Sequence, residues 1–241
     1  MKPADSALWP AVNLRTHEAH VWIAATEEVT ALDCLSSEEL RRWSRILPRE
    51  PRRAFAAAHA LTRHALSWCV PAVRPSEWQL RASKPHGRPE ICAPLLDENI
   101  RVNLSHTDDM VAVVVARTVP CGIDVERRTD PATVARLSER VLSAAEVARM
   151  RGLEPEARAD HFCLLWTLKE ATTKALGKGL SLPFATVGFD FDESHQAHRA
   201  DGDREWSMKS WRASPQHHVS VAVHAPAVDF VIHKLPEEIR V

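Results

Sequence analysis

The chain has 241 residues, of which 45 % are hydrophobic and 26 % charged, with only seven glycines against eight tryptophans. This composition predicts a globular protein with a sizeable core and excludes a low-complexity, disordered chain. Thirty-one basic residues against thirty-two acidic ones give a net charge of -1, so no global electrostatic field favours nucleic acid or a membrane surface as a partner.

The first half, residues 1–119, is predicted to contain a strand, two helices and then further strands. A strand is expected at 21–25, and a helix should begin at Ser36 or Ser37, where a capping hydroxyl precedes Glu38 and Glu39, and run to about Leu47. The Ala-rich run at 52–70 predicts a long helix with one broad buried face. Short strands at 78–81, 90–92, 101–105 and 110–117 are expected to form an antiparallel meander.

The second half, residues 120–241, repeats this order. We predict a strand through 122–125, a helix entered by Asp130 and Pro131, another capped by the Ser143-x-x-Glu146 box, and a long helix at about 155–176 that Gly177 and Gly179 can stop. Strands are expected at 186–191, 206–211, 218–223 and 228–232. The predicted fold is therefore α+β, with two similar, pseudo-twofold related halves. Each packs a long helix on a small, mostly antiparallel sheet, and the active site lies at their interface.

Five widely spaced cysteines without a CxxC pair indicate neither a disulfide framework nor a zinc site, and they are typical of a reducing cytoplasm. The opening residues lack the apolar core of a signal peptide, and no apolar run is long enough to span a bilayer. We therefore expect a cytoplasmic protein without a membrane anchor.

The first candidate site consists of two acidic residues, one within the predicted strand at 122–125 and one directly after it. Side chains at i and i+2 of a strand share one face, so Asp124 and Glu126 should lie side by side while Ile123 and Val125 face the core. Two carboxylates with room for water and phosphate oxygens suit Mg²⁺. The alternative for an isolated D-x-E pair is a strand end with two solvated acids.

The second candidate is the segment from Trp166 to Lys174. Its spacing predicts that Trp166, Lys169, Glu170 and Lys174 lie along one stripe of a helix, with one acid and two bases pointing the same way. Glu170 could then complete a Mg²⁺ site, with the lysines beside it for phosphate. A solvated helix face with a Glu170 to Lys174 ion pair is the simpler alternative.

Basic and polar groups in the first half are weaker candidates. Ser105 and His106 end a predicted strand and could aim a hydroxyl and an imidazole at an anion. A basic turn contains Lys84, His86 and Arg88, which could bind phosphate or form an ordinary hairpin loop. Arginines also gather near the predicted long helix, and several of them could simply be solvated: Arg49, Arg52, Arg53 and Arg63.

Taken together, the motifs NLSH at 103–106, GIDVE at 122–126, VLSAAE at 141–146 and WTLKEATTK at 166–174 resemble, in order and spacing, the two-half, surfactin-type (group II) 4'-phosphopantetheinyl transferases. HGRP at 86–89 and KGL at 178–180 extend the resemblance, which spans residues 45–185. Leu142 departs from the family pattern, which has an aromatic residue there.

The resemblance implies roles for individual residues. Asp124, Glu126 and Glu170 would hold Mg²⁺, or Mn²⁺ in its place, against the diphosphate of coenzyme A. Ser105, His106, Lys169 and Lys174 would contact phosphate, and Glu170, Lys174 and Lys169 would act in catalysis, with Glu170 as the base. Coenzyme A contacts of the first half would further include these arginines: Arg88, Arg49, Arg53 and Arg63.

The implied enzyme is a transferase of the holo-[acyl-carrier-protein] synthase type. It would move 4'-phosphopantetheine from coenzyme A to a serine of an apo acyl or peptidyl carrier protein, and we expect a monomer with neither a nucleic-acid nor a membrane partner. Two alternatives stay open at this point. One is a Mg²⁺-dependent nuclease, against which the neutral net charge speaks. The other is an inactive coenzyme A or carrier-binding module.

Overall fold

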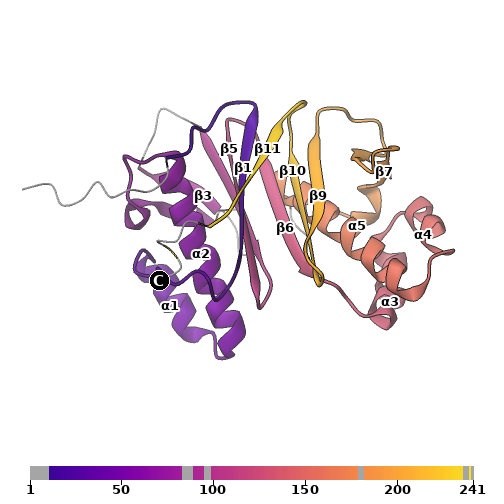
Figure 1. Ribbon diagram of the computed structural model, residues 1–241, viewed down its shortest axis with the longest axis horizontal. Coiled ribbons are helices and arrows are strands. Elements are labelled where there is room, and N and C mark those ends of the chain that lie inside the picture. The colour runs from indigo at the N-terminus through magenta and orange to yellow at the C-terminus, as the bar shows by residue number, and fades with distance from the viewer. Residues whose placement is uncertain (1–10, 83–88, 95–98, 179–181, 236–238, 240–241) are drawn as a thin grey trace, which may run out of the picture.

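The computed structural model describes residues 11–82, 89–94, 99–178, 182–235 and 239. Figure 1 shows four layers: the long helix α2, a first sheet, a second sheet and the long helix α5. In the part of the chain so described, no helix is both long and apolar enough to cross a membrane. The first layers are built from β1 (Glu18–Ala25), α1 (Ser37–Arg45), α2 (Arg49–Cys69), η1 (Pro75–Glu77), β2 (Gln79–Ala82), β3 (Pro89–Ala93), β4 (Ile100–His106) and β5 (Met110–Arg117).

The second half repeats the order of these elements and adds one helix and a last strand. It comprises β6 (Cys121–Arg127), α3 (Pro131–Val141), α4 (Ala144–Met150), α5 (Pro155–Ala175), η3 (Phe184–Thr186), β7 (Phe189–Phe191), β8 (Ala197–Arg199), β9 (Ser207–Ser214), β10 (His217–Val223) and β11 (Asp229–His233). The helices predicted from capping residues and apolar periodicity are confirmed to within a few residues. The short strand β8 had not been predicted.

The two sheets share one strand arrangement. The first has the order β11-β1-β5-β4 and the second the order β6-β10-β9, so β1, β5 and β4 correspond to β6, β10 and β9. Within each set of three the pairing is antiparallel. This mixed α+β architecture, with mostly antiparallel sheets, agrees with the predicted fold class.

Two expectations about strand pairing need correction. The predicted meander of the first half is wrong: among the described residues β2 and β3 pair with each other and with no other strand, while β1 lies beside β5. Local pattern cannot show this, since β5 is apolar on both faces and can accept partners from far along the chain. The last strand, β11, crosses back and pairs in parallel with β1, so the sheet of the first half includes a strand from the predicted second half.

A shared core joins the two sheets face to face. Along β5, Ala112, Val114 and Ala116 point into it, while Val111 and Val113 point into the core beneath α2. From β6, Ile123 and Val125 enter the shared core, as the strand alternation predicts. The opposite face of β6 must then turn Asp124 and Glu126 toward α5, which packs on this strand.

Gly122 is the point of closest approach between β6 and α5. A Cβ atom there would lie 2.0 Å from the Ala171 carbonyl oxygen and 2.6 Å from the Ala175 nitrogen, both of which are backbone atoms. The glycine of GIDVE therefore permits the contact that places Glu170 and Lys174 beside Asp124.

Replacing Gly122 with Ala should force α5 away from β6. We expect a loss of roughly 1 to 3 kcal/mol in the free energy of unfolding, typical of an overpacked core, and a displaced Glu170 and Lys174. Chemical denaturation measures the first effect and an activity assay of the folded variant the second. Gly152, where a Cβ would meet nothing within 4 Å, provides the matched control, and equal effects at both sites would contradict the close-approach argument.

Candidate active site

Three side chains from three elements meet where the halves join. The Ser105 hydroxyl on β4 donates to Asp124 Oδ1 on β6 at 2.8 Å, and Lys174 Nζ on α5 reaches the same oxygen at 2.6 Å. Lys174 also donates to Ser105 Oγ at 2.9 Å and to the Ile123 carbonyl at 3.2 Å. Ser105 and Asp124 are buried, whereas Lys174 is partly exposed. The group therefore opens to solvent on the side of the lysine.

The NLSH segment brings β4 to β6 through its first residue as well. The buried Asn103 side chain accepts a hydrogen bond from the Ile123 backbone nitrogen at 3.1 Å, so an amide replaces a ladder partner between the two halves. Ser105 then follows two residues later on the same face of β4. This is why the serine of one half meets the aspartate of the other.

The carboxyls of Glu126 and Glu170 lie within electrostatic range of Asp124. Burial, and next the charge of Asp124, raise the pKa of Glu126 to about 7. Burial and then Asp124 also raise the pKa of Glu170, against the opposing effect of Lys174. Negative charge is thus concentrated and poorly compensated around these three residues.

Their donor chemistry fits a divalent cation, although a ready-made cage is absent. Among the described residues, no three His, Cys, Asp or Glu side chains are arranged so that they could hold a metal ion as they stand. Lys174 instead lies against Asp124 Oδ1, while Asp124 Oδ2 is buried and has no hydrogen-bond partner in the described part of the chain. An orphaned carboxylate oxygen next to two carboxyls of raised pKa is suited to a hard cation.

Trp166 fixes one of these carboxyls. Its indole nitrogen donates to Glu126 Oε1 at 3.3 Å. Its ring packs edge-on against the ring of Phe184, with the two ring centroids 5.6 Å apart. A small pocket of about 110 Å³ opens beside Glu126, lined by Glu126, Thr129, Leu137, Phe162, Cys163 and Trp166. The predicted stripe of Trp166, Glu170 and Lys174 therefore does lie toward the site.

Lys169 does not belong to that stripe, and this prediction requires correction. Its ammonium group is fully buried and ion-paired with Glu146 at 2.8 Å, and it donates to the carbonyls of Phe184 and Val187 at 3.0 and 2.6 Å. Residues 166, 170 and 174 recur every four positions, but 169 is turned by about 100° from 170 on a helix. Lys169 is therefore a core residue of the second half, and its ammonium group is taken up by Glu146 and two backbone carbonyls.

Glu146 is the partner that the sequence had not identified. The VLSAAE motif was recognised as a capping box, and Ser143 and Glu146 do form one at the start of α4. The Glu146 carboxylate, however, also binds Lys169 and accepts from the Phe189 nitrogen at 3.0 Å. The motif thus joins α4, α5 and β7 in one buried network.

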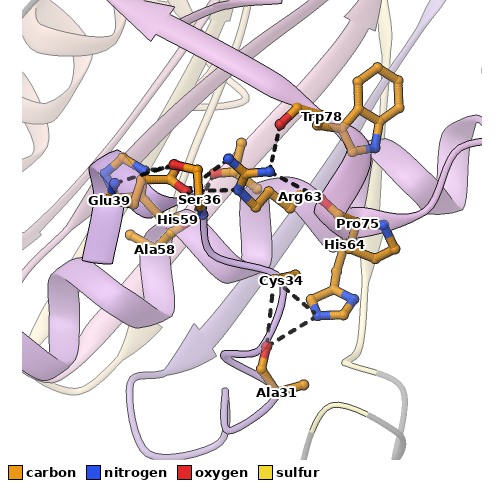
Figure 2. Close-up of polar contacts among 11 residues, drawn as sticks. Ala31, Cys34, Ser36, Glu39, Ala58, His59, Arg63, His64, Pro75 and Trp78 are labelled. Carbon is orange, nitrogen blue, oxygen red and sulfur yellow. Dashed lines mark hydrogen bonds and ion pairs between the residues drawn. The ribbon is translucent and has the colours of Figure 1, made fainter. Parts of the chain in front are cut away.

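The arginine predictions have mixed outcomes. Arg63 is buried, pairs with Glu39 at 2.8 Å and donates to the carbonyls of Pro75 and Trp78, so it is not available to a ligand (Figure 2). Arg49 is exposed at the start of α2, and Arg53 is half-buried with its Nε lacking a partner. Neither is recorded in contact with the described Ser105 group. Arg88 lies outside the described residues, as do Lys84 and His86.

His106 ends β4 next to Ser105. Its desolvation, followed by the positive charges of His59 and Lys174, lowers the pKa of His106. The effect of Lys174 shows that His106 lies near the Ser105 group, and the effect of His59 shows that it also lies near α2. His59 had not been singled out in the sequence, because an isolated histidine in an Ala-rich helix carries no motif.

The fold and this site define a two-half α+β protein that brings a serine, carboxyls and a lysine together where its halves meet. Residues 120–226 match the model of the 4'-phosphopantetheinyl transferase superfamily. This confirms the resemblance drawn from the motifs.

Individual relatives extend over more of the chain. A 4'-phosphopantetheinyl transferase of Bacillus subtilis is 26% identical over 231 residues, covering 90% of this chain and 95% of the relative. The 4'-phosphopantetheinyl transferase HetI of Nostoc sp. is 29% identical over 177 residues, covering 71% of this chain and 74% of the relative. Among solved structures, a holo-(acyl-carrier-protein) synthase from Bacillus anthracis matches with a TM-score of 0.41 and 18% identity, over 45% of this chain and 97% of that one.

Proposed function

We propose that this protein transfers 4'-phosphopantetheine from coenzyme A to a serine of an apo carrier protein, releasing 3',5'-adenosine bisphosphate. The observation that supports it best is the meeting of Ser105, Asp124 and Lys174 across the two halves, with Glu126 and Glu170 beside them. The match of residues 120–226 to the superfamily model supports the same reaction, and so do the relatives that are named for this activity.

In a transfer of this phosphoryl type, the protein acts mainly by positioning the reacting groups and by stabilising charge, and the site residues have both roles. Lys174 and Ser105 offer donors for the diphosphate, and His106 lies next to them. Glu170 takes the proton of the attacking carrier serine, because its raised pKa makes it a better base at neutral pH than an ordinary glutamate. The carrier oxygen then bonds to the phosphorus that carries pantetheine, and the bond to the adenosine bisphosphate oxygen breaks.

A divalent cation, Mg²⁺ or Mn²⁺, is the proposed cofactor. Asp124, Glu126 and Glu170 would hold it, and it would supply Lewis-acid stabilisation of the phosphate charge. Asp124 Oδ2, buried and unpaired, is the observation in the site that favours it.

Mg²⁺ should stabilise the protein more at pH 8 than at pH 5.5. The pKa of Glu126 is about 7 when folded against 4.5 as a free group, so its charging costs stability as pH rises through this window, and a cation relieves that cost. At about 100 times its dissociation constant, Mg²⁺ should raise the melting temperature by roughly 5 to 10 °C at pH 8 and by much less at pH 5.5. Asp124→Asn should remove the shift, and a shift that survives in this variant would contradict the assignment.

The transfer itself is tested by mass spectrometry. The protein is incubated with coenzyme A, Mg²⁺ and an apo carrier protein, and the carrier should gain one phosphopantetheine. Omitting coenzyme A, or replacing the carrier serine with Ala, gives the controls. No gain across acyl and peptidyl carriers, together with cleavage of a nucleic-acid substrate, would instead support a metal-dependent nuclease.

We propose that the acceptor is an acyl or peptidyl carrier protein. The Bacillus subtilis relative, a 4'-phosphopantetheinyl transferase that matches over 90% of this chain, supports an enzyme of the same length and two-half build. Comparing rates with one carrier of each type decides between them. We further propose a monomer, because the two halves of one chain already build the site.

A further inference from the structure

A second polar contact joins the two halves at the turn between β4 and β5. His217, the first residue of β10, places Nε2 2.9 Å from Asp109 Oδ1, and its Nδ1 lies 2.8 Å from Ser214 Oγ at the end of β9. Asp109 belongs to the first half, whereas His217 and Ser214 belong to the second. The imidazole therefore links the halves, and only 5% of its side chain is exposed.

Hydrogen bonds hold the His217 ring in one orientation. Burial raises the pKa of Asp109, but hydrogen bonds from Thr107 and His217, together with nearby positive charge, outweigh it and lower the pKa. Asp109 is therefore an anion that can only accept, so His217 Nε2 carries a proton. Ser214 Oγ accepts from the Gln216 nitrogen at 3.1 Å and can donate its own proton to Nδ1. Both ring nitrogens thus have a partner.

The turn that carries Asp109 is also tied to its own half. The Thr26 nitrogen donates to the Asp109 carbonyl at 2.9 Å. Within the turn, Thr107 Oγ1 donates to Asp109 Oδ1 at 2.9 Å and accepts from the Met110 nitrogen at 3.1 Å. A turn with this many internal bonds moves as one unit with the end of β4. Displacing Asp109 should therefore displace Ser105 as well.

The contact lies close to the candidate active site. Asp109 comes four residues after Ser105, and His217 pairs with Arg127, which comes three residues after Asp124 on β6. At about 3.3 Å per residue, the contact is roughly 10 Å from the place where Ser105 meets Asp124. Arg127 Nη1 also lies 3.6 Å from Asp109 Oδ2, so β6 reaches the same carboxylate. Two polar contacts thus fix the position of β4 relative to β6.

We infer that Asp109 and His217 form a clamp that positions Ser105 against Asp124 and thereby sets the affinity of the site for the diphosphate of coenzyme A. The inference rests on the proposed function, in which Ser105 and Lys174 bind that diphosphate. Asp109 and His217 are positioning residues, because they act through Ser105. Their effect should be measurable, since misplacing such a group by about 1 Å can cost up to 10²-fold.

Amide hydrogen exchange without any ligand tests the clamp itself. The Ile123 nitrogen donates to Asn103 Oδ1 between the halves, so its exchange rate reports how firmly they are joined. His217→Ala should speed this exchange roughly 10-fold, because a hydrogen bond to a charged group is lost. His217→Gln keeps a donor for Asp109 and an acceptor for the Ser214 hydroxyl, and it should restore most of the protection. Amides inside α2 should keep their wild-type rates.

Calorimetry then measures coenzyme A binding by the same folded variants. Asp109→Ala and His217→Ala should each weaken binding by roughly 10-fold, and the double variant should be little worse than either, because both changes remove one contact. His217→Gln should again recover most of the affinity. Melting curves confirm that each variant is folded.

Asp108→Ala is the matched control. Asp108 precedes Asp109 in the same turn and is exposed, and its side chain has no recorded hydrogen bond or ion pair within the described chain. It should leave both the exchange of Ile123 and the affinity for coenzyme A within about twofold of wild type, as expected for a surface charge.

Three outcomes would overturn the clamp and leave the transfer reaction standing. The first is an unchanged Ile123 exchange rate in His217→Ala, and the second is an equal acceleration inside α2, which would show a general loss of stability. The third is faster Ile123 exchange with unchanged affinity for coenzyme A. A wild-type chain that binds no coenzyme A would overturn the proposed function and, with it, the effect on affinity.

Discussion

Replacing Glu170 with Gln should leave coenzyme A binding nearly intact and reduce transfer by roughly 10²- to 10⁴-fold, the range expected when a general base is lost. Gln has the same shape but cannot accept the proton of the carrier serine. The burial of Glu170, and next the proximity of Asp124, raise the pKa of this carboxyl, which adapts it to this step. Single-turnover transfer to an apo carrier, followed by mass spectrometry, measures the rate, and calorimetry measures coenzyme A binding.

Glu156→Gln is a suitable control for that experiment. Glu156 lies on the first turn of the same helix, is largely exposed and pairs with Arg128 at 3.1 Å. Losing such a surface pair should cost about 1 kcal/mol or less and leave the transfer rate unchanged. If Glu170→Gln transferred at the wild-type rate, Glu170 would have no catalytic role. If it lost coenzyme A binding and transfer in equal measure, Glu170 would act in binding and not as a base.

Replacing Lys169 with Met should cost the folded protein about 3 to 5 kcal/mol, because it leaves the buried carboxylate of Glu146 without its counter-ion. Lys169 and Glu146 are both fully buried, and burial lowers the pKa of Lys169 against the attraction of Glu146. The large effect should therefore appear in the free energy of unfolding, measured by chemical denaturation.

The double variant Glu146→Gln, Lys169→Met separates this explanation from a simple packing defect. Removing both charges should recover part of the loss, since the second change no longer strands a buried ion. Lys209→Met, at an exposed position of β9, should change stability little. Additive losses in the double variant would show that the pair contributes no coupling. A stable Lys169→Met chain that no longer bound coenzyme A would restore the phosphate role predicted from the motif.

The two halves use the same device for their long helices. Ser36 and Glu39 form a capping box and Glu39 pairs with Arg63, just as Ser143 and Glu146 form one and Glu146 pairs with Lys169. Arg63 and Lys169 occupy the same position of their 21-residue helices, and each donates to carbonyls around the following 3-10 helix. Both had been predicted to bind coenzyme A, and in the structure both are buried ion-pair partners of a capping-box glutamate.

Local signals were sufficient to predict most elements and the resemblance to a transferase superfamily. Capping boxes, apolar periodicity and strand alternation are properties of neighbouring residues, so helix starts such as Ser36 and Ser143 and the outward face of Asp124 could be predicted. The order of four short motifs predicted the resemblance to the superfamily whose model matches residues 120–226. What failed was the direction of Lys169, because an i+3 spacing places a side chain at the edge of a helical stripe, where packing decides which way it turns.

The sequence alone determined the α+β class and the repeated order of elements. It also determined a candidate set of metal ligands: Asp124, Glu126 and Glu170. The tertiary structure decided which residues meet. It paired β11 with β1, brought Ser105 to Asp124 and Lys174, and turned Arg63 and Lys169 into buried ion pairs. The physical reason is that a contact such as that between Gly122 and Ala171 depends on backbone surfaces from distant segments fitting together, and such long-range fits leave no periodic trace in the chain.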